Sequence, residues 1–179
     1  ISALCERTGA NVVEVARAVG MDPRIGPDFL RAGVGFGGSC FRKDILNLAY
    51  LCEAHGLHEA AAYWQQVVEI NEYQRTRFVR TMLDAMFNTL AGKRIAVLGF
   101  AFKPGTNDTR DSPSAAICRL LLDERAALAV SDPRALENAR NDLQDAADCE
   151  FHADPYAAAR GAHAVAVLTG WPEYRTLDF

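Results

Sequence analysis

The spacing of apolar residues divides the chain into a helical first half and an alternating second half. In residues 1–20 they recur at helical spacing, with a possible break at Thr8-Gly9 and a stop at Gly20. Further helices are expected over residues 45–56 and 59–88. The second of these contains no proline or glycine and would be about 45 Å long. A helix of that length is a natural subunit interface, because a small domain rarely encloses it.

After residues 91–93 the pattern becomes that of strands. Residues 94–100 (RIAVLGF) form a continuous apolar run, typical of a strand buried on both faces of a parallel sheet. Ser112 and Pro113 supply an N-cap and a first-turn proline for a helix that should run to about Glu124. Shorter strands are expected at residues 127–130, 149–152 and 163–168.

This alternation of strands and helices predicts a doubly wound α/β sheet. We therefore expect an α/β protein with an all-α domain over residues 1–90 and a Rossmann-like parallel sheet domain over residues 91–179. A complete sheet of this type has about two more strands, so the second domain is expected to be truncated.

The composition of the chain excludes several classes of function. The net charge of −4 argues against bulk attraction to nucleic acid or to an anionic membrane, and no apolar run is long enough to span a bilayer. The five cysteines are odd in number and widely spaced, which disfavours a disulfide framework or a metal site and favours a reducing, cytoplasmic environment. Among them, Cys5, Cys52 and Cys118 lie in apolar surroundings and are expected to be buried and inert.

The chemistry is concentrated in residues 33–44 (GVGFGGSCFRKD), which lead directly into a helix. Four glycines allow the backbone to approach a ligand closely. A helix N-terminus and neighbouring cations lower the pKa of a cysteine thiol, and the thiolate is the reactive form. Cys40 is therefore the candidate nucleophile, with Lys43 and Asp44 beside it; the alternative is an ordinary glycine-rich turn.

A second candidate is the polar loop between the strand ending near Gly99 and the helix starting at Ser112. It lacks the second and third glycines of a dinucleotide fingerprint, so that signal is weak. The loop nevertheless carries phosphate-binding groups before a helix N-terminus: Lys103, Thr106, Thr109 and Arg110. The alternative is a solvated loop without a ligand.

Two of these segments resemble the UDP-glucose 6-dehydrogenase family. Residues 36–44 (FGGSCFRKD) are similar to its active-site signature, and residues 95–103 with 107–113 are similar to its UDP-binding domain. The resemblance implies oxidation of UDP-glucose to UDP-glucuronate, with NAD⁺ used twice. It implies that Cys40 forms a thiohemiacetal and then a thioester, that Asp44 orients or deprotonates water, and that Lys43 stabilises the thiolate.

The resemblance also implies the binding residues. Cys40, Lys43 and Arg110 would contact NAD⁺, and Arg24 would reach the UDP site of a neighbouring subunit, so the enzyme would be at least a dimer. The remaining substrate-binding residues would be Phe29, Leu30, Arg31, Val34, Gly35, Phe36, Gly37, Phe41, Phe102 and Lys103.

The sequence also departs from the family pattern. The family has an N-terminal NAD⁺-binding domain with a G-x-G-x-x-G turn that these residues lack, so we expect the piece alone to be inactive. Pro104, Gly105 and Asn107 replace more usual residues in the second loop, which puts its detailed shape in question.

Three alternatives stay open. The substrate could be GDP-mannose or a UDP-linked amino sugar, because the base and the C2 substituent are not readable from these motifs. The chain could be a non-catalytic dimerisation module that binds nucleotide sugars. A cysteine hydrolase is the least favoured, because no histidine has a suitable spacing from Cys40.

Overall fold

The first 33 residues form a unit of their own in the computed structural model, which describes residues 1–179. Its helices are α1 (Ser2–Thr8) and α2 (Val12–Gly20). The expected break is confirmed: α1 ends at Gly9, and the side chain of Asn11 accepts a hydrogen bond from the amide of Val13 to cap α2.

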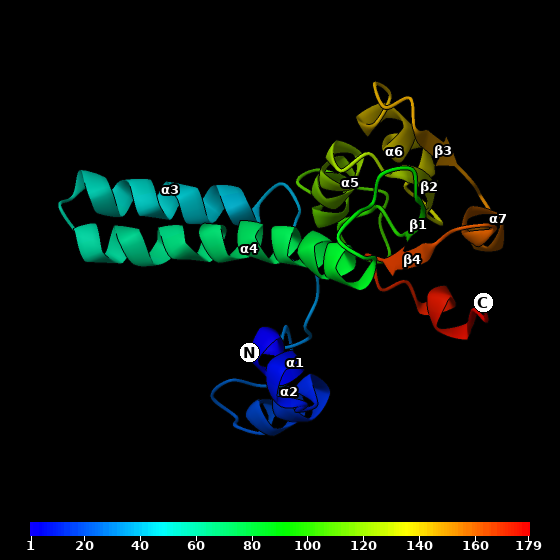
Figure 1. Cartoon of the computed structure of the whole chain (residues 1–179). Helices are drawn as coiled ribbons and strands as arrows, with labels where there is room; N and C mark the ends of the chain where they lie inside the picture. Colours follow the sequence, from blue (N-terminus) through cyan, green and yellow to red (C-terminus); the bar gives the residue numbers. More distant parts are fainter. The chain divides into compact units, whose positions relative to one another are not determined.

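A long antiparallel hairpin of helices opens the second unit, Val34–Phe179. It consists of α3 (Phe41–Ala54) and α4 (His58–Ala85), which lie side by side (Figure 1). With 28 residues, α4 is about 42 Å long. It ends three residues before the position expected from the sequence, because Phe87 and Asn88 adopt positive φ angles that no α-helix accommodates.

The second half forms a four-stranded parallel sheet in the order β3-β2-β1-β4. Its strands are β1 (Arg94–Leu98), β2 (Ala127–Ser131), β3 (Cys149–Phe151) and β4 (Ala164–Val167). The helices that follow them are α5 (Pro113–Asp123), α6 (Leu136–Asp142), α7 (Pro155–Ala159) and the 3₁₀ helix η1 (Pro172–Thr176). The predicted α/β fold with a Rossmann-like parallel sheet is therefore confirmed.

Helices cover both faces of this sheet because alternate residues of each strand point to opposite sides. Ile95 and Val97 of β1 pack on one side with Ile117 and Leu121 of α5. On the other side, Leu98 and Ala129 pack with Ala158 of α7. Each fully buried aliphatic side chain contributes about 1.5–3 kcal/mol relative to an exposed one.

The C-terminal end of α4 belongs to the same core as the sheet. Val79 is buried in the cluster that contains Ile95, and Met82 and Met86 pack against it. The hairpin is therefore anchored on the sheet, and residues 34–90 share one unit with residues 91–179.

The sequence did not predict α6, α7 or η1, which are short and carry little apolar periodicity. Of the cysteines expected in the core, Cys5 and Cys118 are buried, whereas Cys52 is only partly buried. None of the helices combines the length and the apolar character needed to cross a membrane.

Candidate active site

Cys40 occupies the N-cap position of α3 and is exposed. No side chain caps this helix, so its first-turn N–H groups remain available, and the positive end of the helix dipole lies at the cysteine. The closest polar side chain to the sulfur that the structure records is Ser39, whose Oγ lies 3.7 Å from Sγ. A substrate can therefore reach the thiol at a place that favours negative charge.

The first turn of α3 also presents Lys43 and Asp44. Both side chains are exposed, at 72% and 68% respectively, and Lys43 Nζ lies 3.8 Å from the Asp44 carboxylate. The amide of Asp44 donates a 2.9 Å hydrogen bond to the carbonyl of Cys40 as the first helical bond. An exposed ion pair of this kind contributes little stability, so both side chains are free to turn toward a ligand.

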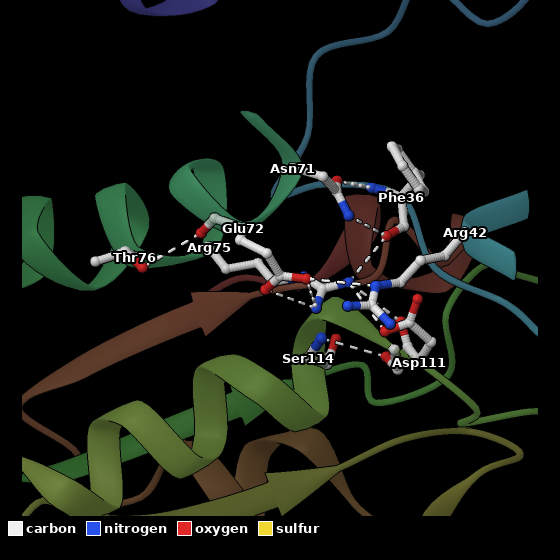
Figure 2. Close-up of polar contacts among 9 residues, drawn as sticks. Phe36, Arg42, Asn71, Glu72, Arg75, Thr76, Asp111 and Ser114 are labelled. Carbon is white, nitrogen blue, oxygen red and sulfur yellow. Dashed lines mark hydrogen bonds and ion pairs between the residues drawn. The ribbon is translucent and has the colours of Figure 1, made fainter. Parts of the chain in front are cut away.

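The segment before Cys40, residues 34–40, is called the thiol loop below. It has no regular structure and is held by side chains of α4 (Figure 2). The side-chain amide of Asn71 pairs with Phe36: Phe36 N donates to Asn71 Oδ1 at 2.8 Å, and Asn71 Nδ2 donates to the Phe36 carbonyl at 3.0 Å. The amide thus satisfies both backbone groups of Phe36, as a neighbouring strand would.

The thiol loop also packs against residues 102–112, here called the α5 loop. Gly38 N donates a 3.0 Å hydrogen bond to the carbonyl of Arg110. A Cβ atom on Gly37 would lie 2.5 Å from the carbonyl oxygen of Asp111, and one on Gly38 would lie 3.0 Å from the ring of Phe102. Only glycine permits this approach, so the two candidate loops of the sequence meet at these positions.

The α5 loop exposes two cations. Lys103 Nζ lies 5.2 Å from the centre of the Phe102 ring, and the guanidinium of Arg110 binds both carboxylate oxygens of Asp108. The hydrogen bonds to Asp108 and the negative charge of its carboxylate raise the pKa of Arg110. The same bonds lower the pKa of Asp108. Arg110 is therefore cationic and paired with Asp108.

A cleft of about 330 Å³ opens at the start of α5. Three arginines line it, together with the N-cap residue Ser112. The complete lining is Arg75, Thr109, Arg110, Asp111, Ser112, Ala115, Ala116, Arg119 and Asp142. Cationic side chains at a helix N-terminus suit an anionic ligand. Of the predicted candidate residues, Thr109 and Arg110 line this cleft, whereas Cys40, Lys43 and Lys103 lie outside its lining.

By contrast, the carboxyl ends of β1 and β2 are filled by protein groups. The buried carboxylate of Asp132 accepts hydrogen bonds from the amides of Phe100, Ala101, Arg134 and Ala135 and from the indole of Trp171. A Cβ on Gly99 would overlap Thr169. In a sheet with this strand order a dinucleotide ordinarily binds at the carboxyl ends of β1 and β4, where Gly99 and Thr169 are in close contact and Asp132 is bound by protein groups.

The structure divides the predicted substrate residues between its two units. Val34, Gly35, Phe36, Gly37, Phe41, Phe102 and Lys103 all lie in the second unit. There the Phe36 and Phe41 rings are 4.7 Å apart. Arg24, Phe29, Leu30 and Arg31 lie in the first unit. Phe29 is fully exposed with a positive φ, and Arg24 binds Asp22 through two hydrogen bonds that raise the Arg24 pKa.

Sequence reasoning missed Asn71, Arg75 and Asp132 as site-forming residues. Asn71 and Arg75 are both 4% exposed on α4, and Asp132 is 3% exposed. The available signal was a polar residue, Asn71, within the apolar series of a helix. Burial of such a residue requires hydrogen-bond partners, which here come from the thiol loop.

Comparison with known proteins identifies the family to which the chain belongs. Residues 1–73 match the UDP-glucose/GDP-mannose dehydrogenase family, central domain, and residues 96–179 match the UDP binding domain of the same family. UDP-glucose 6-dehydrogenase from Drosophila melanogaster is 52% identical, and UDP-glucose 6-dehydrogenase 2 from Oryza sativa subsp. japonica is 50% identical. Both alignments cover 100% of this chain, and they cover 40% and 41% of those proteins.

Among solved structures, a UDP-glucose dehydrogenase from the hyperthermophilic archaeon Pyrobaculum islandicum superposes with a TM-score of 0.88 at 40% identity. The superposition covers 97% of this chain and 39% of that one. The chain therefore belongs to the UDP-glucose/GDP-mannose dehydrogenase family. It spans about 41% of the length of the rice relative.

Proposed function

We propose that the full-length protein is an NAD-dependent UDP-glucose 6-dehydrogenase, which oxidises UDP-glucose to UDP-glucuronate by four electrons. One observation carries the proposal: the exposed Cys40 at the start of α3 is joined through Gly38 to the loop that presents Lys103 and Arg110. A nucleophile, a cation for the substrate nucleotide (Lys103) and a cation for NAD⁺ (Arg110) are thereby held in one unit. The relatives named above have the same activity in their names.

Cys40 acts as the nucleophile. Loss of a first hydride from C6 and of the hydroxyl proton turns the C6 alcohol of the sugar into an aldehyde. The Cys40 thiolate adds to this aldehyde, forming a carbon–sulfur bond, and the former carbonyl oxygen takes a proton to give a thiohemiacetal. Removal of a hydride from C6 and a proton from the oxygen then leaves a thioester. A sulfur nucleophile suits this sequence because it adds readily and also leaves readily.

Asp44 completes the reaction. It orients a water molecule and accepts its proton as the oxygen attacks the thioester carbon; the carbon–sulfur bond then breaks and Cys40 returns as thiolate. Lys43, in the same helical turn, stabilises the anionic sulfur between steps. Both side chains are exposed and are not held by the fold, so they can adopt these positions.

The α5 loop and the thiol loop bind the substrate. Phe102 and Lys103 hold the nucleotide, while residues 34–37 and Phe41 surround the sugar. The remaining contacts come from the first unit: Phe29, Leu30, Arg31 and, from a neighbouring subunit, Arg24. The active protein is then at least a dimer. The protein is proposed to be cytoplasmic, because the five cysteines of this chain are few and widely spaced, unlike a disulfide framework.

The residues at the start of α5 fit an anionic dinucleotide, because Arg110 and Arg119 line a cleft at a helix N-terminus. NAD⁺, when bound, supplies the acceptor for the two hydrides. Arg110 would hold its phosphates, and Cys40 and Lys43, which lie at the start of α3 outside the lining of this cleft, would approach its reacting end. The closed crevice at Asp132 is not available for this purpose.

The test is a substrate panel for the full-length protein. NADH formation is measured with UDP-glucose, GDP-mannose and a UDP-linked N-acetyl amino sugar at equal concentrations. The proposal expects the highest kcat/KM for UDP-glucose and two NADH per UDP-glucuronate formed. Preference for another sugar would replace the substrate assignment, and UDP-sugar binding without NADH formation would favour a non-catalytic binding module.

A further inference from the structure

Arg75 lies where the thiol loop, the α5 loop and α4 meet (Figure 2). Its Nη2 donates to the carbonyl of Phe36 at 3.2 Å, and to the backbone carbonyl and side-chain carboxylate of Asp111, both at 3.4 Å. Its Nη1 binds Glu72 of the same helix. One buried guanidinium therefore contacts the residue four positions before Cys40 and the residue that follows Arg110.

These contacts are long compared with the 2.7–2.9 Å of strong charged hydrogen bonds, but few other groups could replace them. The Phe36 carbonyl has only Asn71 as its other recorded partner, and Asp111 holds a positive φ of 50° that costs a non-glycine residue conformational energy. A buried charge without partners would be expensive, so Arg75 fixes both backbones to the same point.

Arg75 lines the cleft at the start of α5, but its side chain is only 5% exposed and both of its Nη atoms are bound to protein groups. Resting on the proposed function, we propose that Arg75 is a positioning residue: it sets the separation between the Cys40 sulfur and the Lys103–Arg110 cations. Lysine carries the same charge but has a single side-chain nitrogen, so it cannot hydrogen-bond to Glu72, Phe36 and Asp111 at the same time.

The separation matters because the two loops hold opposite ends of one substrate. The diphosphate is held on the α5 loop, whereas the sugar carbon must meet sulfur on the thiol loop. An error of about 1 Å in such an arrangement can lower the rate by about a hundredfold without loss of binding. A defect at Arg75 should therefore appear in kcat more than in KM.

The experiment compares Arg75→Met, Arg75→Lys and the control Arg80→Met in the full-length protein. Arg80 lies five residues further along the same helix and is exposed. We expect kcat for UDP-glucose to fall about 10- to 100-fold in Arg75→Met, less in Arg75→Lys, and to stay within about twofold in Arg80→Met, with KM nearly constant in all three.

A second readout does not depend on turnover. The rate of iodoacetamide alkylation of Cys40 is followed by peptide mass spectrometry without nucleotide, with Cys52 on the same helix as internal reference. In Arg75→Met the Cys40 rate should change by about threefold or more while the Cys52 rate stays constant. General loosening of the fold would instead raise both rates.

The proposal is overturned if folded Arg75→Met keeps the wild-type kcat and the wild-type Cys40 alkylation rate, or if Cys40 and Cys52 rates rise together. Should Arg75→Met fail to fold, Arg75→Lys and Asp111→Asn decide by the same two readouts. If the wild-type protein does not oxidise UDP-glucose, the proposed function fails, and the alkylation rates still decide the role of Arg75.

Discussion

Two glycine-containing turns of this protein lead into helices, and they differ in whether their polar groups are exposed or are bound by other protein groups. The thiol loop leads into α3 with its cysteine exposed and its helix uncapped. The turn after β1 leads toward α5 with Gly99 pressed against Thr169, a buried carboxylate at Asp132, and a helix capped by Ser112. Polar groups at the first turn remain available to a ligand, whereas those at the second satisfy one another.

The comparison teaches where a nucleotide can be held. In the second region the protein itself uses the amides and the acidic residue that a Rossmann domain ordinarily offers to a dinucleotide. The exposed cations are displaced to the α5 loop, which Gly38 joins to the thiol loop.

The largest expected effect concerns the thiol loop, whose cysteine is exposed. Cys40→Ala in the full-length protein should lower kcat with UDP-glucose about a thousandfold or more, because no other nucleophile occupies that position. UDP affinity, measured by calorimetry, should change little. Cys52→Ala, a partly buried cysteine of the same helix, is the control. Near-normal turnover by Cys40→Ala would remove the covalent mechanism.

The next largest effect is expected at the turn after β1, where the carboxylate of Asp132 is buried. Asp132→Asn should lower the free energy of unfolding by about 2–4 kcal/mol, because the amide cannot accept all the hydrogen bonds that the buried carboxylate receives. The urea unfolding midpoint measures this, with the exposed Asp123→Asn as control. An unchanged midpoint would mean that the crevice is less tightly filled than its contacts indicate.

A smaller effect is expected where the two loops meet. Gly37→Ala should cost about 1–3 kcal/mol of stability and reduce kcat, because the added methyl group would displace the carbonyl of Asp111 or the ring of Pro113. Gly170→Ala, where an added methyl group meets no other atom within 4 Å, is the control. Equal behaviour of the two variants would contradict the close packing of the loops.

The smallest effect concerns the other thiols. Burial raises the pKa of Cys149 to about 11 and raises that of Cys118 still further. Because the thiolate is the reactive form, Cys149 alkylation should be slow at pH 7 and rise about tenfold per pH unit until pH approaches 11. The exposed Cys40 should be alkylated first, as peptide mass spectrometry can show. Unfolded protein, in which all five cysteines react, is the control.

The sequence by itself determined most of the element types and singled out Cys40 as the candidate nucleophile. The spacing of apolar residues predicted α4 and β1, and the capping residues predicted the start of α5 at Ser112 and Pro113. These signals depend only on residues close together in the sequence. The glycine–cysteine–cation cluster identified Cys40 for the same reason. The short helices α6 and α7 were not predicted, because they carry little periodic apolar pattern and are stabilised by packing against the sheet.

Only the tertiary structure decided which polar groups are free. Asp132 follows a strand as a ribose-binding residue would, yet its carboxylate is consumed by amides distant in sequence. Arg75 looks like a surface cation of a long helix, yet it is buried between loops that are more than 30 residues away along the chain. Hydrogen-bond satisfaction depends on which segments meet in space, and no local pattern of residue types records that meeting.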